Sequence, residues 1–340
     1  MASATRQLKT RRQFLAASRD LGLAVLGGSL LAACSSPSAA GSHIYRLGIV
    51  YVNGTVASKN AFLGQLRKLG YVEGQNILVE MRDAGGNADR LPALFAEVIA
   101  WGADVIYASG TQTAIAAKLA TVRSHVPVVA LMADPVGTGI VNNLARPGGN
   151  LTGVSLFANQ LAAKRAQLLN EVMPDLERVG VLYQPDDPSR VSEFVATVAA
   201  GNVFGWETLP IEIRFKEEIP DAFEHMLSIG IQAIIVPTDP LTLTSAGPIT
   251  SLALDYRMPG MYGDVRFASL GGLMGYSASS LEQQAKAADY VHRIFHGAKP
   301  ADLAIQQPAR FEFIVNIKTA NVLGMRLPPS VIERATDLIA

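Results

Sequence analysis

The feature that most constrains this chain is a regular alternation of short apolar runs and longer amphipathic segments. The runs have the length of strands and are rich in β-branched residues, whereas the segments between them have the apolar spacing of helices. We expect strands at 45–52, 77–81, 103–108, 127–132, 178–183, 207–213, 233–237, 259–263 and 271–277. Strands separated by helices form parallel sheets that are covered on both faces. The alternation therefore predicts an α/β fold.

The alternation falls into two series, which predicts two lobes with parallel sheets. A Gly/Pro-rich stretch at 146–153 separates the series, and one more strand at 310–317 and a closing helix follow late in the chain. We expect the chain to cross between the lobes near 155, 277 and 305, so that three segments form a hinge beside a cleft. On this division the N-terminal lobe comprises 45–155 and 278–305, and the C-terminal lobe comprises 156–277 and 306–340.

The N-terminal segment has the pattern of an export signal. It contains Arg11-Arg12, as in a twin-arginine signal, and then an uncharged apolar run at 21–33 that is too short to span a bilayer. The sequence Leu-Ala-Ala-Cys ending at Cys34 is similar to a bacterial lipobox, so we expect residues 1–33 to be a lipoprotein signal peptide and Cys34 to carry lipid. Residues 34–44 then form a flexible tether. The alternative is an N-terminal helix with a chance cysteine.

The charge balance bears on possible partners. The whole chain has no net charge, but without the basic N-terminal segment the remainder carries −4. A mildly acidic body without a basic stripe argues against a nucleic-acid partner. We expect an exported monomer that is held at a membrane surface by lipid.

Small polar residues follow the predicted strands of the first series. In open parallel sheets, ligands bind beyond the carboxyl ends of the strands, where helix N-termini present free N–H groups. These loops therefore suit a carboxylate, and their candidate binding residues are Asn53, Gly54, Thr55, Ser109, Gly110, Thr111, Gln112 and Asp134. The alternative for each is that it only caps the next helix.

The second series supplies acidic and aromatic candidates. Asp186, Asp239 and Asp264 follow predicted strands and could pair with a ligand ammonium group. Phe157, Tyr183 and Tyr276 could stack on an apolar part of the ligand. The prediction of a site depends on several of these loops meeting in one cleft.

Motifs of catalysis are missing from the sequence. It contains no GxGxxG, Walker, GxSxG or HExxH pattern, so we expect a protein that is not an enzyme and needs no cofactor or metal. His292 and His296 lie one helical turn apart and could chelate a metal, but a third ligand is not evident. Asp134 and Asp264 remain as an alternative acid/base pair for an exported hydrolase or isomerase.

Long motifs in the body resemble the ABC-transporter substrate-binding family that includes tryptophan- and tyrosine-binding lipoproteins. They are LGYVEGQNI (69–77), DPVGTGIV (134–141), LARPGGNLTGVS (144–155), GAKPADLAIQQP (297–308) and FEFIVNIKTANVLG (311–324). The resemblance implies two Rossmann-like lobes of the type I periplasmic-binding fold. It also implies capture of a small solute, an amino acid or related carboxylate, and delivery to a membrane permease with a separate ATPase. A ligand sensor that docks to a membrane receptor would use the same lobes and stays an alternative.

Overall fold

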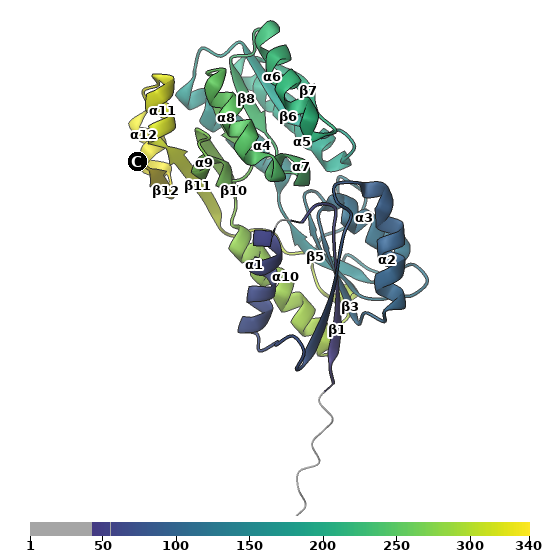
Figure 1. Ribbon diagram of the computed structural model, residues 1–340. Coiled ribbons are helices and arrows are strands. Elements are labelled where there is room, and N and C mark those ends of the chain that lie inside the picture. Colours follow the sequence, from purple (N-terminus) through teal and green to yellow (C-terminus); the bar gives the residue numbers. More distant parts are fainter. Residues whose placement is uncertain (1–42, 55) are drawn as a thin grey trace, which may run out of the picture. The chain divides into compact units, whose positions relative to one another are not determined.

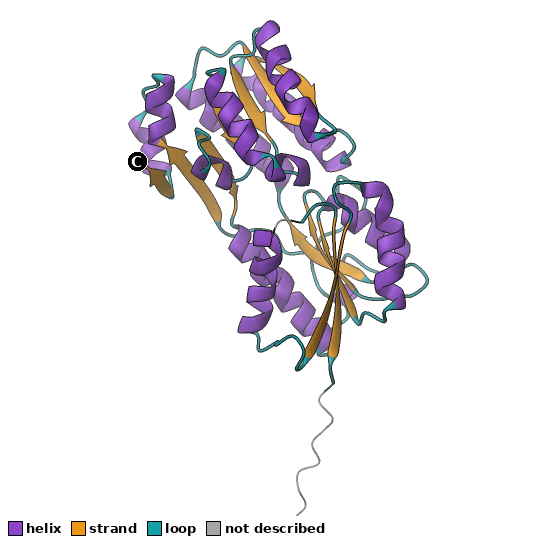
Figure 2. Ribbon diagram, viewed as in Figure 1, coloured by secondary structure: helices purple, strands orange, loops and turns teal. Residues whose placement is uncertain are grey.

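The computed structural model describes residues 43–54 and 56–340. The expected signal peptide, Cys34 and most of the tether lie outside the described residues, as does Thr55. Figures 1 and 2 show that the described body contains two sheets with helices on their faces. In this part of the chain no helix is both long and apolar enough to cross a membrane.

The first lobe is built on a five-stranded sheet in which every pair of neighbouring strands is parallel. The strand order is β2-β1-β3-β4-β5. The strands are β1 (Tyr45–Tyr51), β2 (Ile77–Asp83), β3 (Val105–Ser109), β4 (Val128–Met132) and β5 (Leu151–Ser155). The helices are α1 (Val56–Lys68), α2 (Leu91–Ala100), α3 (Thr111–Ala120) and α10 (Ser280–Phe295). One buried cluster joins the sheet to α2 and α3, and another joins it to α1 and α10, so both faces are covered.

The second lobe is built on a seven-stranded sheet in the order β12-β11-β10-β9-β8-β6-β7. Its strands are β6 (Arg178–Tyr183), β7 (Glu207–Glu212), β8 (Ala233–Val236), β9 (Gly260–Tyr262), β10 (Met274–Ala278), β11 (Phe311–Asn316) and β12 (Asp337–Ile339). Its helices are α4 (Ala158–Val172), α5 (Pro188–Phe204), α6 (Ile219–Ser228), α7 (Pro240–Thr244), α8 (Ala246–Asp255), α9 (Arg266–Ser269), α11 (Ile317–Leu323) and α12 (Pro329–Arg334). Two buried clusters again lie on the two faces.

The prediction of an α/β fold with two lobes and a three-segment hinge is confirmed. The chain leaves the first sheet after β5, returns between β10 and α10, and leaves again before β11. One detail differs from the expected parallel pairing, because β10 and β11 are antiparallel. The chain also ends in strand β12 rather than in a closing helix.

Gly153 shows how closely two strands of the first lobe approach each other. It lies in β5 with φ +153°, and a Cβ atom there would lie 1.9 Å from the carbonyl oxygen of Ala130 in β4. Only glycine allows this approach. The Gly-rich stretch therefore belongs partly to the sheet and not only to the crossing between lobes.

Candidate functional site

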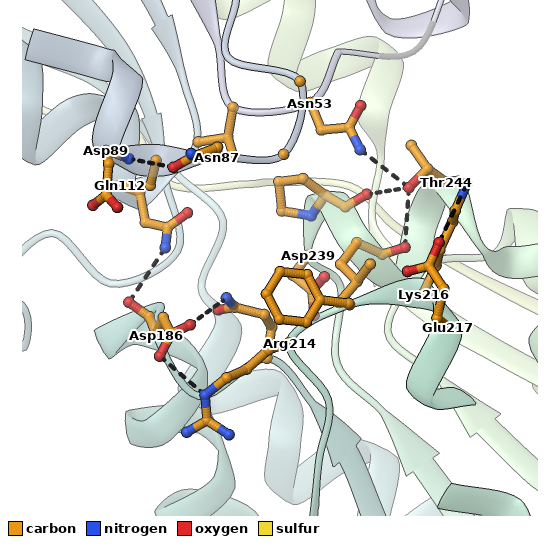
Figure 3. Close-up of a pocket in the computed structure, with 18 residues that line it drawn as sticks. Asn53, Asn87, Asp89, Gln112, Asp186, Arg214, Lys216, Glu217, Asp239 and Thr244 are labelled. Carbon is orange, nitrogen blue, oxygen red and sulfur yellow. Dashed lines mark hydrogen bonds and ion pairs between the residues drawn. The ribbon is translucent and has the colours of Figure 1, made fainter. Parts of the chain in front are cut away.

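A cleft of about 720 Å³ lies where loops of the two lobes face each other. Its first-lobe wall contains Asn53 after β1, Asn87 and Asp89 after β2, and Gln112 in the first turn of α3. The second-lobe wall comes from the loops after β6, β7 and β8, and its polar members are Gln184, Asp186, Arg214, Lys216, Glu217, Asp239 and Thr244. Figure 3 shows these side chains converging from both lobes. All of the loops follow carboxyl ends of parallel strands, where a ligand site is expected.

Two hydrogen bonds connect the lobes across the mouth of this cleft (Figure 3). The side-chain amide of Asn53 donates to the hydroxyl of Thr244 over 3.3 Å. The side-chain amide of Gln112 donates to the backbone carbonyl of Asp186 over 3.2 Å. Each bond can form only while the two lobes are close together. The side chains of Asn53 and Gln112 are therefore placed to stabilise the closed arrangement.

Asp239 is the carboxylate most deeply placed in the cleft wall. One oxygen, Oδ1, accepts a hydrogen bond of 2.8 Å from the backbone N–H of Thr242 and thereby caps α7. The other oxygen, Oδ2, is buried and has no hydrogen-bond partner among the described residues. Asp239 is only 4% exposed, and burial raises its pKa to about 6. A buried carboxylate oxygen without a partner is costly.

A smaller chamber of about 350 Å³ is lined by elements next to the hinge. Ser109, Ser277 and Gln284 line it, as does Asp264, whose carboxylate forms two hydrogen bonds of 2.8 Å with the guanidinium of Arg266. Both carboxylate oxygens of Asp264 are therefore bonded to a guanidinium group, whereas Oδ2 of Asp239 has no hydrogen-bond partner among the described residues. The chamber presents neutral polar groups on its first-lobe side and ion pairs on its second-lobe side.

Buried charges of α4 and α5 form part of the wall of this inner chamber. Glu193 of α5 pairs with the guanidinium groups of both Arg165 and Arg190, and each of the three residues is at most 3% exposed. Arg165 also donates over 3.0 Å to the backbone carbonyl of Tyr276, close to the hinge. Burial lowers the pKa of Arg165. The network fixes the second lobe's wall because none of these charges can lose its partner without a large cost.

The structure brings six of the predicted binding residues to the two chambers. Asn53, Gln112, Asp186 and Asp239 line the cleft, and Ser109 and Asp264 line the inner chamber. The aromatic candidates lie elsewhere: Tyr183 packs in the core on Phe194, Tyr276 stacks on Phe311, and Phe157 precedes α4 in a left-handed conformation.

Four other predicted residues are engaged by other parts of the protein, and for Asp134 one of these partners, Asn159, lies in α4 of the second lobe. The N–H of Gly54 donates to Asp83 over 3.0 Å, and Gly110 precedes α3 with φ +112°. The Thr111 hydroxyl accepts from the N–H of Ala133 over 3.1 Å. Asp134 accepts from the N–H of Gly137 over 2.9 Å and from the side-chain amide of Asn159 over 2.7 Å. None of these contacts is a side-chain cap of the next helix, whereas Asp239 does cap α7 as the alternative expected.

Several cleft residues were not predicted. Arg214, Phe215 and Lys216 follow β7, and Asn87 follows β2. The same rule of strand ends could have found both loops. Thr244 could not have been found, because it lies at the far end of a short helix that only the packed structure brings opposite Asn53.

The arrangement gives no support to the metal alternative. His292 bonds through Nδ1 to the Tyr71 hydroxyl over 3.0 Å, and His296 lies against the backbone carbonyl of His292. Over 43–54 and 56–340, no group of three His, Cys, Asp or Glu side chains is placed to hold a metal ion.

Two α/β lobes with a polar cleft between them define a solute-binding protein of the type I periplasmic fold. The sequence pattern of the ABC transporter substrate binding protein family matches residues 47–339, so the chain belongs to that family. It is a family of substrate-binding proteins rather than of enzymes.

Individual proteins and solved structures are similar to this chain. A tyrosine-binding protein of Clostridioides difficile (strain R20291) is 24% identical over 270 residues, which are 79% of this chain and 77% of that protein. An ABC domain from Streptococcus pneumonia, solved in complex with L-Trp, superposes with a TM-score of 0.80 at 22% identity, covering 87% of this chain and 100% of that one. A conserved domain protein from Vibrio cholerae also gives a TM-score of 0.80, at 23% identity, covering 86% of this chain and 99% of that one.

Proposed function

We propose that the protein is an extracytoplasmic lipoprotein that binds an amino acid, or a closely related amine-bearing carboxylate, in the cleft and delivers it to an ABC permease with a separate ATPase. The observation that carries the proposal is the buried, unpartnered Oδ2 of Asp239 in the wall of a cleft lined by both lobes. The volume of about 720 Å³ is within the range of small-molecule sites. The relatives named for tyrosine and solved with L-Trp support an amino acid as the ligand.

The amine of the ligand is assigned to Asp239. An ammonium group donates to Oδ2 and supplies the positive charge that the buried carboxylate lacks on that side. Arg190 is a basic group that acts on Asp239, and it is already held by Glu193. A cationic donor from the ligand therefore completes the site.

The carboxylate of the ligand is assigned to neutral donors of the first lobe. Asn53, Asn87 and Gln112 line the cleft and carry side-chain amides, each with a second N–H available besides the bonds that Asn53 and Gln112 form to the other lobe. The described residues of that wall include Asp89 and no basic side chain, and the basic side chains of the cleft, Arg214 and Lys216, lie on the second-lobe wall. A ligand that is bound by its amine on one lobe and by its carboxylate on the other holds the lobes together, which favours the closed arrangement.

Binding to the membrane is assigned to Cys34. The support is the sequence alone, in which the only cysteine follows an apolar run of signal-peptide length. A lipid on Cys34 keeps the binding body beside the permease.

Calorimetry and thermal unfolding of the purified protein test the ligand assignment. The probes are L-tryptophan and L-tyrosine together with two matched analogues of tryptophan, tryptamine without the carboxylate and indole-3-propionate without the amine. We expect at least one amino acid to bind and raise the Tm, and both analogues of a bound tryptophan to bind more than tenfold more weakly. Equal binding of indole-3-propionate and tryptophan would contradict the assignment of the amine to Asp239, and no binding of either amino acid would exclude tryptophan and tyrosine as the ligand.

A further inference from the structure

One large apolar side chain stands exposed in the wall of the cleft. Phe215 is 64% exposed, and it is the only aromatic side chain among the described residues that line the cleft. It belongs to neither buried cluster of the second lobe. A phenylalanine ring in water gains free energy when a second apolar surface covers it. The ring of Phe215 is therefore available to a ligand in the cleft.

The backbone holds Phe215 in place without help from its ring. The N–H of Phe215 donates to the carboxylate of Glu218 over 3.4 Å, and the carbonyl of Phe215 accepts from the N–H of Glu218 over 3.1 Å. The N–H of Arg214 donates to the same carboxylate over 2.6 Å. None of these bonds involves the side chain of Phe215. A smaller side chain at this position therefore leaves the hydrogen bonds of the loop intact.

The first-lobe wall leaves room for a ligand side chain. In the loop after β2, Gly85 and Gly86 have no side chain and Ala88 has only a methyl group. Apart from its chain neighbours, a Cβ atom at Gly86 would meet only Nδ2 of Asn53, 4.0 Å away. Space therefore remains beside this turn, within a cleft of about 720 Å³.

The cations on either side of Phe215 are already paired. The guanidinium of Arg214 lies 3.6 Å from the carboxylate of Asp186, and the ammonium of Lys216 lies 3.8 Å from the carboxylate of Glu217. An acidic ligand side chain would have to compete with these carboxylates. This part of the wall therefore gives little preference to an acidic side chain, whereas the exposed ring prefers an apolar one.

We infer that Phe215 determines the specificity of the site by stacking on an aromatic side chain of the ligand. The inference rests on the proposed function, in which the amine of the ligand binds Asp239. Pro240 and Leu241 follow Asp239 directly in the chain and line the cleft together with Phe215. The side chain of a ligand held at Asp239 thus meets an apolar wall that includes this ring. Stacking of two rings raises the affinity about two- to tenfold beyond the effect of the apolar area that they bury, so an aromatic side chain is favoured over an aliphatic one.

Calorimetry with matched ligands and variants of the purified protein tests this role. The probes are L-tryptophan, L-tyrosine, L-leucine and L-arginine, and the variants are Phe215→Ala and Phe215→Tyr, of which the second keeps a ring. Leu227→Ala is the matched control, because Leu227 in α6 is 58% exposed and does not line the cleft. Thermal unfolding without ligand should give all three variants the Tm of the parent, since both positions are exposed.

The expected result is a loss of affinity that depends on both the variant and the ligand. Phe215→Ala should bind the aromatic amino acid that the parent binds about tenfold or more weakly, and should bind L-leucine at most about threefold more weakly. Phe215→Tyr and Leu227→Ala should stay within about twofold of the parent for every probe.

The contrary outcomes distinguish failure of this inference from failure of the proposed function. If Phe215→Ala binds the aromatic amino acid as the parent does, or loses affinity for L-leucine to the same degree, Phe215 does not select the ring, and the assignment of the amine to Asp239 is untouched. Binding of L-leucine as tightly as the aromatic amino acids, or tighter binding of L-arginine through Asp89 of the first-lobe wall, would also overturn the inference alone. If the parent binds none of the four amino acids, the inference and the proposed amino-acid ligand fail together.

Discussion

Replacing Asp239 by asparagine is expected to weaken ligand binding and at the same time to stabilise the empty protein. Asparagine is a good N-cap and can still accept from the N–H of Thr242, so α7 is preserved. The substitution removes the negative charge and puts an NH2 group in the place of Oδ2, which has no partner among the described residues. The two expected effects have opposite signs, which separates a ligand-binding role from a purely structural one.

The stability effect follows from the pKa of Asp239, which burial raises from 3.8 to about 6. Below about pH 4 the carboxyl group is protonated in both the folded and the unfolded chain, and asparagine changes little. As the pH rises towards 6, the unfolded chain ionises first, and the folded protein becomes less stable by up to about 3 kcal/mol. Asp239→Asn should therefore gain most of that free energy of unfolding at pH 7 and almost none at pH 4.

The binding effect follows from a charge-assisted hydrogen bond, which contributes about 1.5–3 kcal/mol. Its loss corresponds to roughly tenfold to 150-fold weaker binding. In the parent, affinity should rise with pH up to about 6 and stay level above it, because the ligand ammonium needs the ionised carboxylate. The affinity of the Asp239→Asn variant should not rise with pH over this range.

Calorimetry across pH 5–8 measures the affinity, and urea unfolding at pH 4 and pH 7 measures the stability. Asp186→Asn is the control, because Asp186 lines the same cleft but its carboxylate is 57% exposed and pairs with Arg214 on the surface. It should change binding by less than about 1 kcal/mol. If Asp239→Asn binds like the parent, or is less stable than the parent at pH 7, the reasoning about Oδ2 is refuted.

Three further predictions concern the lobes, the buried charges and the anchor. Asn53→Ala removes the 3.3 Å bond to Thr244 across the cleft and should weaken ligand binding by up to about tenfold in calorimetry, and an unchanged affinity would show that the bond does not favour closure. Glu193→Ala leaves the buried guanidinium of Arg165 unpaired and should lower the free energy of unfolding in urea by about 3–5 kcal/mol, whereas a loss below 1 kcal/mol would contradict the network. Cys34→Ser should move the protein from the membrane fraction to the soluble fraction, and lipid labelling of that variant would disprove the anchor.

The sequence by itself determined the fold class and the division into two lobes. Both depend on local periodicity, because an apolar run of strand length followed by an amphipathic helix specifies a parallel sheet without knowledge of distant residues. The expected export signal and the expected lipid on Cys34 rest on the sequence alone and stay predictions. The antiparallel pairing of β11 with β10 was not predictable in this way, because strand direction depends on how the chain returns from the other lobe.

Only the tertiary structure decided which strand-end residues face the cleft. Thr111 and Asp239 look equivalent in the sequence, since each is a polar residue between a strand and a helix. In the fold, the Thr111 hydroxyl bonds to Ala133 of a neighbouring strand's loop, whereas one oxygen of Asp239 remains without a partner. The physical reason is that a polar group's partners come from segments far apart in the chain, so the spacing of residues predicts where donors and acceptors occur, and packing decides which of them are left for a ligand.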